Sequence, residues 1–346
     1  TVVITERGGE RRMVRRRGGR RGARRVQVRS EESGDDSVNE LALINRSGKK
    51  LLLLGGEVIV GGKQDRIVEE DLIVPAVSVP VSLSVFCVEH GRWSHRSERA
   101  VGAGGVGGGG GGGVGVGSGP VQAASETVEV VASPSVVEAN VSASQSTSNE
   151  MSVSGSRSAS ASRPETFSSL GAISHPKLRA AAQDKKEQGE VWKEVSANNV
   201  RLNTTNTTDT YQQVYESEEV RATMDDYVAA LQGELAGADV VGVVVARGGE
   251  LIWVDQFASP SLFRRYWPKL LKSYVVEAIS GPTEERKPGV EEAQRYLDER
   301  SGDAKATVKP GVYELTKLEN PRYAVFDLWD ISKAARVRLH YNKMQR

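Results

Sequence analysis

Two short charged segments in the first hundred residues carry side chains that could do chemistry. The first is GGEVIVGGKQDR, in which Glu57 stands in an apolar run and Lys63, Gln64, Asp65 and Arg66 follow at one turn. Adjacent polar residues of this kind are unfavourable in a core, but together they offer donors for an anionic ligand and one carboxylate. We therefore treat the two acids, Glu57 and Asp65, as candidate catalytic groups. The lysine, glutamine and arginine are candidate ligand-binding groups.

The same segment also has a purely structural interpretation. Its glycine pairs suit a β-hairpin or bulge, because glycine adopts backbone angles that other residues avoid. A Walker phosphate loop is excluded, since that motif needs Gly, four further residues and then Gly-Lys-Ser/Thr at the start of a helix. Here Glu57 occupies the first glycine position and Gln64 replaces the hydroxyl residue. The segment predicts either a ligand-binding turn or a hairpin that only shapes the sheet.

The second charged segment is CVEHGRW, at the end of a predicted strand. Glu89 shares a strand face with Cys87, so it follows a row of apolar residues toward the core. A buried carboxylate needs a partner, for which Arg66 or Arg92 is suitable. The segment predicts either a buried Glu–Arg pair that joins two sheets, or a general acid/base beside an arginine that binds phosphate or carboxylate. Trp93 either stacks on a planar ligand or packs in the core.

Other kinds of site have less support in the sequence. The lone cysteine and nearby histidines lack the paired spacing of four ligands that a closed zinc site needs, so no metal is predicted, and no pattern specifies a cofactor. Cys87 lies in an apolar run and is predicted to be inert packing. No serine-nucleophile elbow is present. Asp255 ends the strand-like run LIWV and is a candidate to line a ligand-binding cleft.

The elements that position these residues follow from hydrophobic periodicity. Residues 26–93 are predicted to form successive β-strands separated by turns. The second half is predicted to be mixed, so the whole chain is expected to be α+β, with a β-rich N-terminal half and the helices of the second half packed on the sheets. The helices are expected over 175–198, 217–235, 259–275 and 290–300, and the strands over 240–246, 251–254, 307–315, 323–329 and 335–341.

A single domain with a large insertion is predicted. Residues 1–97 form its β-rich first part, which carries an Arg-rich loop at 7–25. Its opening strand, TVVITE, is expected to lie within the domain, after the natural start. Residues 98–165 are dominated by Gly, Ser, Val and Ala, and such a segment buries too little apolar surface to fold, so we expect a disordered insertion. Residues 166–346 form the remainder of the same domain.

The composition of the chain limits the classes of partner and the cellular location that we expect. The 46 basic and 45 acidic residues give no overall bias toward nucleic acid or an anionic membrane. The arginines of 7–25 lack interleaved aromatic residues, which favours a solvated loop over a nucleic-acid site. No apolar run reaches the roughly 20 residues that span a bilayer. A single cysteine fits a reducing compartment and favours a cytoplasmic location, although a targeting segment upstream of Thr1 is not excluded.

Two stretches of the chain resemble a known family. They are LLLLGGEVIVGGKQDRIVEEDLIVPA with LSVFCVEHGRWSHRS, within 51–97, and GVVVARGGELIWVDQFASPSLFRRYWPKLLKSYVVEAI, residues 242–279. They are similar to the "ARG and rhodanese-phosphatase-superfamily-associated protein" domain, an uncharacterised family of bacterial type. The shared features are the Gly-Glu strand pair, the Lys-Gln-(Asn/Asp)-Arg turn, the Cys-(Val/Ile)-Glu-x-Gly-Arg-Trp strand end and the Trp-Pro-Lys-Leu-Leu helix. The resemblance covers about residues 26 to 340 without the insertion.

This resemblance points to a class of ligand and leaves the reaction open. The family name records an association with ADP-ribosylglycohydrolases and phosphatases, which implies a link to ADP-ribose or nucleotide metabolism. Two functions therefore remain. The chain either binds or processes an anionic, nucleotide-like small molecule with the residues of the two charged segments, or it is a non-catalytic binding or scaffold domain in which those residues are structural.

Overall fold

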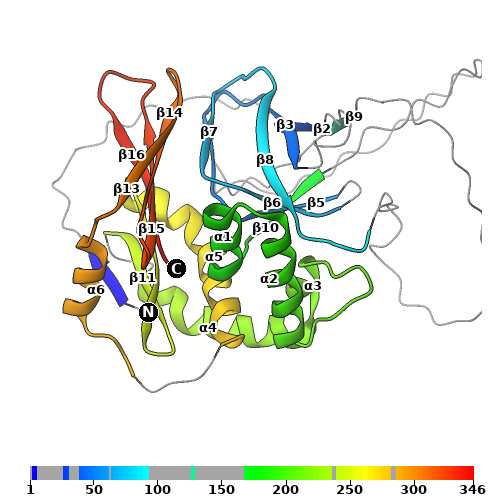
Figure 1. Ribbon diagram of the computed structural model, residues 1–346, viewed down its shortest axis with the longest axis vertical. Helices are drawn as coiled ribbons and strands as arrows, with labels where there is room; N and C mark the ends of the chain where they lie inside the picture. Colours follow the sequence, from blue (N-terminus) through cyan, green and yellow to red (C-terminus); the bar gives the residue numbers. More distant parts are fainter. Residues whose placement is uncertain are drawn as a thin grey trace, which may run out of the picture.

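The computed structural model describes residues 2–5, 26–30, 39–61, 64–92, 126–128, 167–235, 239–281 and 286–346. Within these residues the chain has the predicted α+β fold. A first antiparallel sheet is followed by a block of helices and then by a second antiparallel sheet (Figure 1). The Arg-rich segment 7–25, Lys63, Trp93 and all but three residues of 98–165 lie outside the described residues.

The first sheet has the strand order β10-β5-β6-β8-β3-β2-β9. Its bounds are β2 Val26–Ser30, β3 Glu40–Asn45, β5 Glu57–Gly61, β6 Arg66–Val68, β8 Val81–Cys87, β9 Glu126–Val128 and β10 Phe167–Ile173. Two further strands, β4 Leu51–Leu53 and β7 Leu72–Val74, pair only with each other. Alternate residues of β8, such as Leu83 and Val85, are buried because a strand presents alternate side chains to one face.

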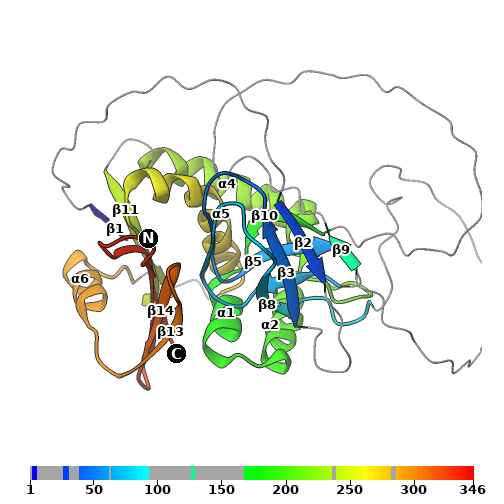
Figure 2. The ribbon, with the colours of Figure 1, turned by 90° about the horizontal axis from the view of Figure 1, so that it is seen from above.

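Helices α1 to α5 lie on one side of the second sheet, and α6 lies on its other side (Figures 1 and 2). The helix predicted over 175–198 is interrupted, because Lys186 adopts a left-handed backbone conformation with φ 55°. Ser259 caps α5, the helix predicted over 259–275, and accepts a hydrogen bond from the Leu262 amide at 3.2 Å. The helical bounds are α1 Pro176–Ala180, η3 (a π turn) Ala181–Lys185, α2 Gln188–Arg201, α3 Gln212–Glu216, α4 Glu218–Leu235, α5 Pro260–Ile279 and α6 Val290–Asp298.

The second sheet has the strand order β1-β11-β12-β16-β15-β14-β13. The single strand predicted over 307–315 is wrong. A hairpin reverses the chain there at Pro310-Gly311, where Gly311 has φ 67°, a conformation that favours glycine. The bounds are β1 Val2–Thr5, β11 Val240–Arg247, β12 Glu250–Phe257, β13 Asp303–Lys309, β14 Tyr313–Glu319, β15 Tyr323–Asp330 and β16 Val337–Gln345.

Helix α5 is the element that joins the two halves. It packs against β10 of the first sheet and against β11 and β12 of the second. Phe263, Trp267, Leu270 and Tyr274 on its buried face belong to one continuous apolar cluster that includes side chains from both sheets. This packing brings residues that are far apart in the sequence into a shared interior, where the polar networks described below are buried.

Replacing Gly242 with alanine is expected to lower the free energy of unfolding by about 1–3 kcal/mol. A Cβ atom at Gly242 would lie 2.4 Å from the Asp255 carbonyl oxygen and 2.8 Å from the Gln256 Cα, so two paired strands would have to separate. Urea denaturation of the variant measures the loss. Gly48→Ala is the matched control, because an added Cβ there meets nothing within 4 Å. Equal stability of the two variants would contradict the prediction.

Candidate functional site

Asp255 is the centre of a buried polar network. It lies in β12 directly opposite Asn342 of β16, and its side chain is fully buried. The Arg179 guanidinium donates to its two carboxylate oxygens at 2.9 and 3.2 Å. The Trp253 indole donates at 2.8 Å, the Asn342 amide at 2.9 Å, and the Tyr274 hydroxyl also donates to it. Every donor is buried, so the Asp255 carboxylate and its partners form a network in the interior.

A histidine connects this carboxylate to a second one. The Nε2 of His340 lies 2.9 Å from Asp255, and its Nδ1 contacts Asp71. Burial alone would lower the pKa of His340, but the carboxylates on both ring nitrogens raise it to about 9. Burial alone would raise the pKa of Asp255, yet Arg179 and His340 hold it well below its usual range. The network therefore joins two buried carboxyl groups, Asp71 and Asp255, to the buried His340 ring and Arg179 guanidinium.

The same network reaches Glu57 through the turn between β4 and β5. The Gly55 amide donates to Asp71 at 2.7 Å, and the Gly55 carbonyl accepts from Arg179 Nε at 3.2 Å. Glu57 begins β5, accepts from the Leu54 amide at 3.3 Å and pairs with Lys269 of α5 at 3.1 Å. Glu57 is buried, so this ion pair ties the first sheet to the central helix.

The second group of predicted residues lies at the other end of the β5–β6 hairpin. Glu89 contacts Arg92 at 2.6 Å and accepts from the Asp65 amide at 3.1 Å. The Asp65 side chain accepts from Thr210 at 2.9 Å and pairs with Arg92 at 3.3 Å. Gln64 donates to the Glu89 carbonyl at 2.9 Å. We refer to these residues as the Glu89 cluster.

Within the Glu89 cluster the charged groups are mostly buried. Arg92 is the partner of Glu89, whereas Arg66, the other predicted partner, hydrogen-bonds Gln64 and the Asp65 carbonyl at 3.4 Å each. Burial would raise the pKa of Glu89, but the hydrogen bonds from Arg92 and Thr208 lower it below its usual range. Burial raises the pKa of the nearby Cys87 thiol, which disfavours the reactive thiolate.

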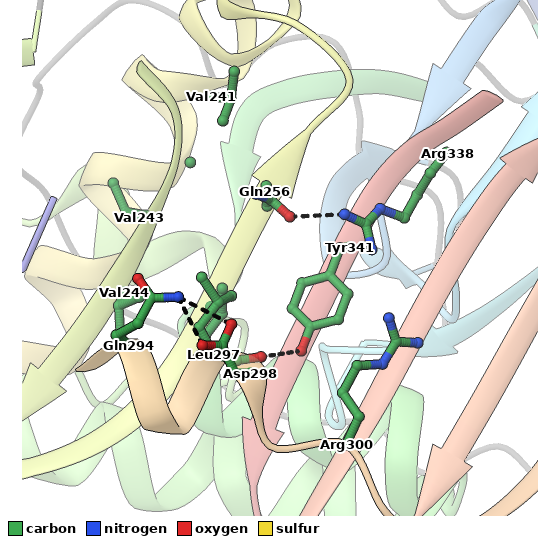
Figure 3. Close-up of a pocket in the computed structure, with 12 residues that line it drawn as sticks. Val241, Val243, Val244, Gln256, Gln294, Leu297, Asp298, Arg300, Arg338 and Tyr341 are labelled. Carbon is green, nitrogen blue, oxygen red and sulfur yellow. Dashed lines mark hydrogen bonds between the residues drawn. The ribbon is translucent and has the colours of Figure 1, made fainter. Parts of the chain in front are cut away.

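A cavity of about 390 Å³ lies elsewhere, between β11, β12, β16 and the segment around α6 (Figure 3). Its apolar lining includes Val241, Val244, Val254 and Leu297. Its polar side contains two arginines, two glutamines, one acid and one tyrosine: Arg300, Arg338, Gln256, Gln294, Asp298 and Tyr341. None of these six residues is a predicted site residue, because they lie on two strands and around a helix that are distant in the sequence.

Neighbouring side chains hold the guanidinium groups of the two cavity arginines in position. Arg300 and Arg338 lie 5.4 and 5.3 Å from the centre of the Tyr341 ring. Both also pair with Asp327, whose side chain is only 4% exposed, whereas their own side chains are 39% and 35% exposed. Arg338 donates to Gln256 at 3.0 Å. Both guanidiniums are thus paired with a buried carboxylate, while their partly exposed side chains leave further N–H groups able to donate.

The carboxylate on the rim of the cavity has a different environment. Asp298 is exposed and accepts two hydrogen bonds of 2.9 Å from the Gln294 amide. It remains able to accept further hydrogen bonds, because each carboxylate oxygen has two lone pairs. The cavity therefore combines cationic donors, a carboxylate acceptor and an apolar wall, which together can hold a molecule that has an anionic group and hydroxyl groups.

Two other kinds of site are not found in the part of the chain that the structure describes. No three side chains among its His, Cys, Asp and Glu residues converge as metal ligands. None of the described helices combines the length and apolar character needed to span a bilayer.

Comparison with known proteins identifies the family. The model of the ARG and Rhodanese-Phosphatase-superfamily-associated Protein domain matches residues 5–105 and 155–330, which is most of the chain. No curated protein and no solved structure gives a significant match. The two matched ranges include Glu57, Arg179 and Asp255, the Glu89 cluster, and Arg300 of the cavity. His340 of the Asp255 network and Arg338 of the cavity lie beyond the second range. The chain therefore belongs to the ARG and Rhodanese-Phosphatase-superfamily-associated Protein domain family.

Proposed function

We propose that this chain is a binding domain for a phosphorylated, nucleotide-like small molecule, which it holds in the cavity of Figure 3. The observation that supports this best is the pair of partly exposed guanidiniums, Arg300 and Arg338, fixed on one tyrosine ring at the edge of a 390 Å³ hollow. Arginine is suited to phosphate because its planar fork donates two parallel hydrogen bonds. Ligand sites of this size commonly have an apolar wall with a few oriented polar groups.

The rest of the cavity fits the sugar and base of such a ligand. Asp298 accepts hydrogen bonds at the rim, and an acidic side chain is a common partner for ribose hydroxyls. Val241 and Leu297, which are both half-buried, offer an apolar surface to a planar ring. The association recorded in the family name makes ADP-ribose and adenine nucleotides the first ligands to test.

In this proposal the residues of the two charged sequence segments are structural. Glu57 and Asp255 hold the sheets and helices together through buried pairs, and Glu89 is bound to Arg92. The alternative places the ligand at the Glu89 cluster, with Arg92 and Arg66 as its anion-binding groups and Glu89 and Asp65 as acid/base groups. That alternative is supported by the location of several charged groups at one hairpin end.

Calorimetric titration of the full chain with ADP-ribose, AMP, ribose 5-phosphate and inorganic phosphate tests the proposal. We expect Arg338→Ala to weaken binding by about 10- to 100-fold, because a charged hydrogen bond contributes about 1.5–3 kcal/mol. Arg336→Ala is the matched control: this arginine is on the same segment but contacts Glu314 and Trp329, outside the cavity. Binding that is lost in Arg92→Ala and kept in Arg338→Ala would favour the Glu89 cluster instead. If none of the four compounds bound, both the cavity proposal and the Glu89-cluster alternative would be contradicted.

A further inference from the structure

The edge strand β13 of the second sheet has an open side. It pairs with β14 along all seven of its residues, and no other described strand pairs with it. Every residue of β13 is exposed, and Val308 is 51% exposed. Such an edge presents backbone N–H and C=O groups that can pair with another strand. We propose that β13 is a self-association surface, through which two copies of the chain pair antiparallel about a twofold axis at Ala306.

The sequence of β13, DAKATVK, complements itself in this register. An antiparallel pair centred on Ala306 is the one alignment in which all seven residues of each copy overlap. It places Asp303 opposite Lys309 of the second copy, and the twofold axis creates this pair twice. Directly opposite side chains on paired strands are close enough for opposite charges to attract.

These charges are not matched within the hairpin to which β13 belongs. Asp303 stands opposite Glu319 of β14, and Lys305 stands opposite Lys317. Like charges in directly opposite positions are unfavourable. In β14, however, Lys317 forms ion pairs with Glu319 of the same strand and with Asp184 of η3, so both of these β14 residues already have partners. A second copy therefore offers Asp303 a cation that its own hairpin does not place opposite it.

The other face of β13 is compatible with the same pairing. Ala304, Ala306 and Val308 alternate with the charged residues and point to the opposite face. In the proposed register Val308 lies opposite Ala304 of the second copy, and Ala306 lies opposite its own equivalent. The pairing thus forms one charged row and one small apolar row, and the two second sheets join into one continuous sheet.

Sedimentation equilibrium of the full chain over a range of concentrations tests this proposal. We expect a monomer–dimer equilibrium in the unmodified chain. Lys309→Glu and Asp303→Lys should each raise the dimer dissociation constant about tenfold or more, because each places like charges opposite each other twice. The double variant Asp303→Lys/Lys309→Glu restores the opposite-charge pair and should return the dissociation constant close to the original value.

The matched control changes a charge on the same strand and face. Lys305 lies opposite Thr307 in the proposed register, so Lys305→Glu should change the dissociation constant by less than about threefold. Circular dichroism confirms that each variant is folded, and because all the substituted residues are exposed, folding is not at risk. A chain that remains monomeric at its solubility limit would overturn the proposal. A dimer that neither single variant weakens would overturn it as well.

Discussion

Replacing Asp255 with alanine is expected to lower the free energy of unfolding by about 3–5 kcal/mol. The carboxylate is fully buried and accepts hydrogen bonds from Arg179, His340 and three further side chains. Its removal leaves the Arg179 guanidinium in the interior without its counter-charge. The cost arises mainly from this uncompensated buried cation, because the net contribution of an intact buried pair is small. Since a domain is stable by only about 5–15 kcal/mol, the expected loss is a large part of the total.

Urea denaturation followed by circular dichroism measures this loss. Trp253 donates directly to Asp255, so its fluorescence reports the local change and should be recorded alongside. Asp255→Asn keeps an acceptor oxygen and removes the charge, so an intermediate loss is expected. Asp298→Ala is the control, because that carboxylate is exposed, and its effect should stay within about 0.5 kcal/mol. If Asp255→Ala cost no more than the control, the network would not be structural.

Much of the fold could be predicted from local sequence patterns. The alternation of apolar residues in VPVSLSVFCV, the hairpin at Arg247-Gly-Gly-Glu and the cap at Ser259 each depend on neighbouring residues alone, and each is present in the structure. The strand predicted over 307–315 failed, because Pro310-Gly311 is a turn signal inside a run that otherwise suits a strand. The break at Lys186 has no comparable signal, since lysine is a good helix former.

The polar networks were harder to predict, because their partners are remote in the chain. Asp71 and His340 are 269 residues apart in the sequence, and Arg179 and Asp255 are 76 residues apart. Local patterns show that a strand is buried on one face, but they do not show which distant strand will lie beside it. One signal was present: His340 and Asn342 are polar residues at alternate positions of a strand near the chain end. Polar residues on the buried face of a strand require partners, which points to a network without naming its members.

Raising the pH from about 6 to about 8 is expected to lower the free energy of unfolding by about 2 kcal/mol through His340 alone. Its pKa in the folded chain, about 9, lies above the ordinary value of about 6.5, because Asp71 and Asp255 bind its two ring nitrogens. A group whose pKa is raised by folding stabilises the folded state fully below its unfolded pKa. That stabilisation is then lost as the pH rises through the folded value.

Lys343, another buried cation, changes the free energy of unfolding in the opposite direction at higher pH. The effect of His340 is therefore best measured below the pH at which Lys343 begins to titrate. Burial lowers the pKa of Lys343 to about 8, so its unfavourable charge is relieved as the pH rises from there toward its ordinary value. The decline caused by His340 should therefore be clearest below about pH 8 and flatten above it.

Unfolding free energies of the unmodified chain and of His340→Gln, compared across this range, isolate the histidine, because the other titrating groups are common to both. The nitrogen chemical shifts of the His340 ring give an independent measurement, which does not require a stable variant. A neutral ring at about pH 7, or equal pH dependence in the two proteins, would mean that the two carboxylates do not hold a proton on His340, and that Arg179 alone compensates their charge.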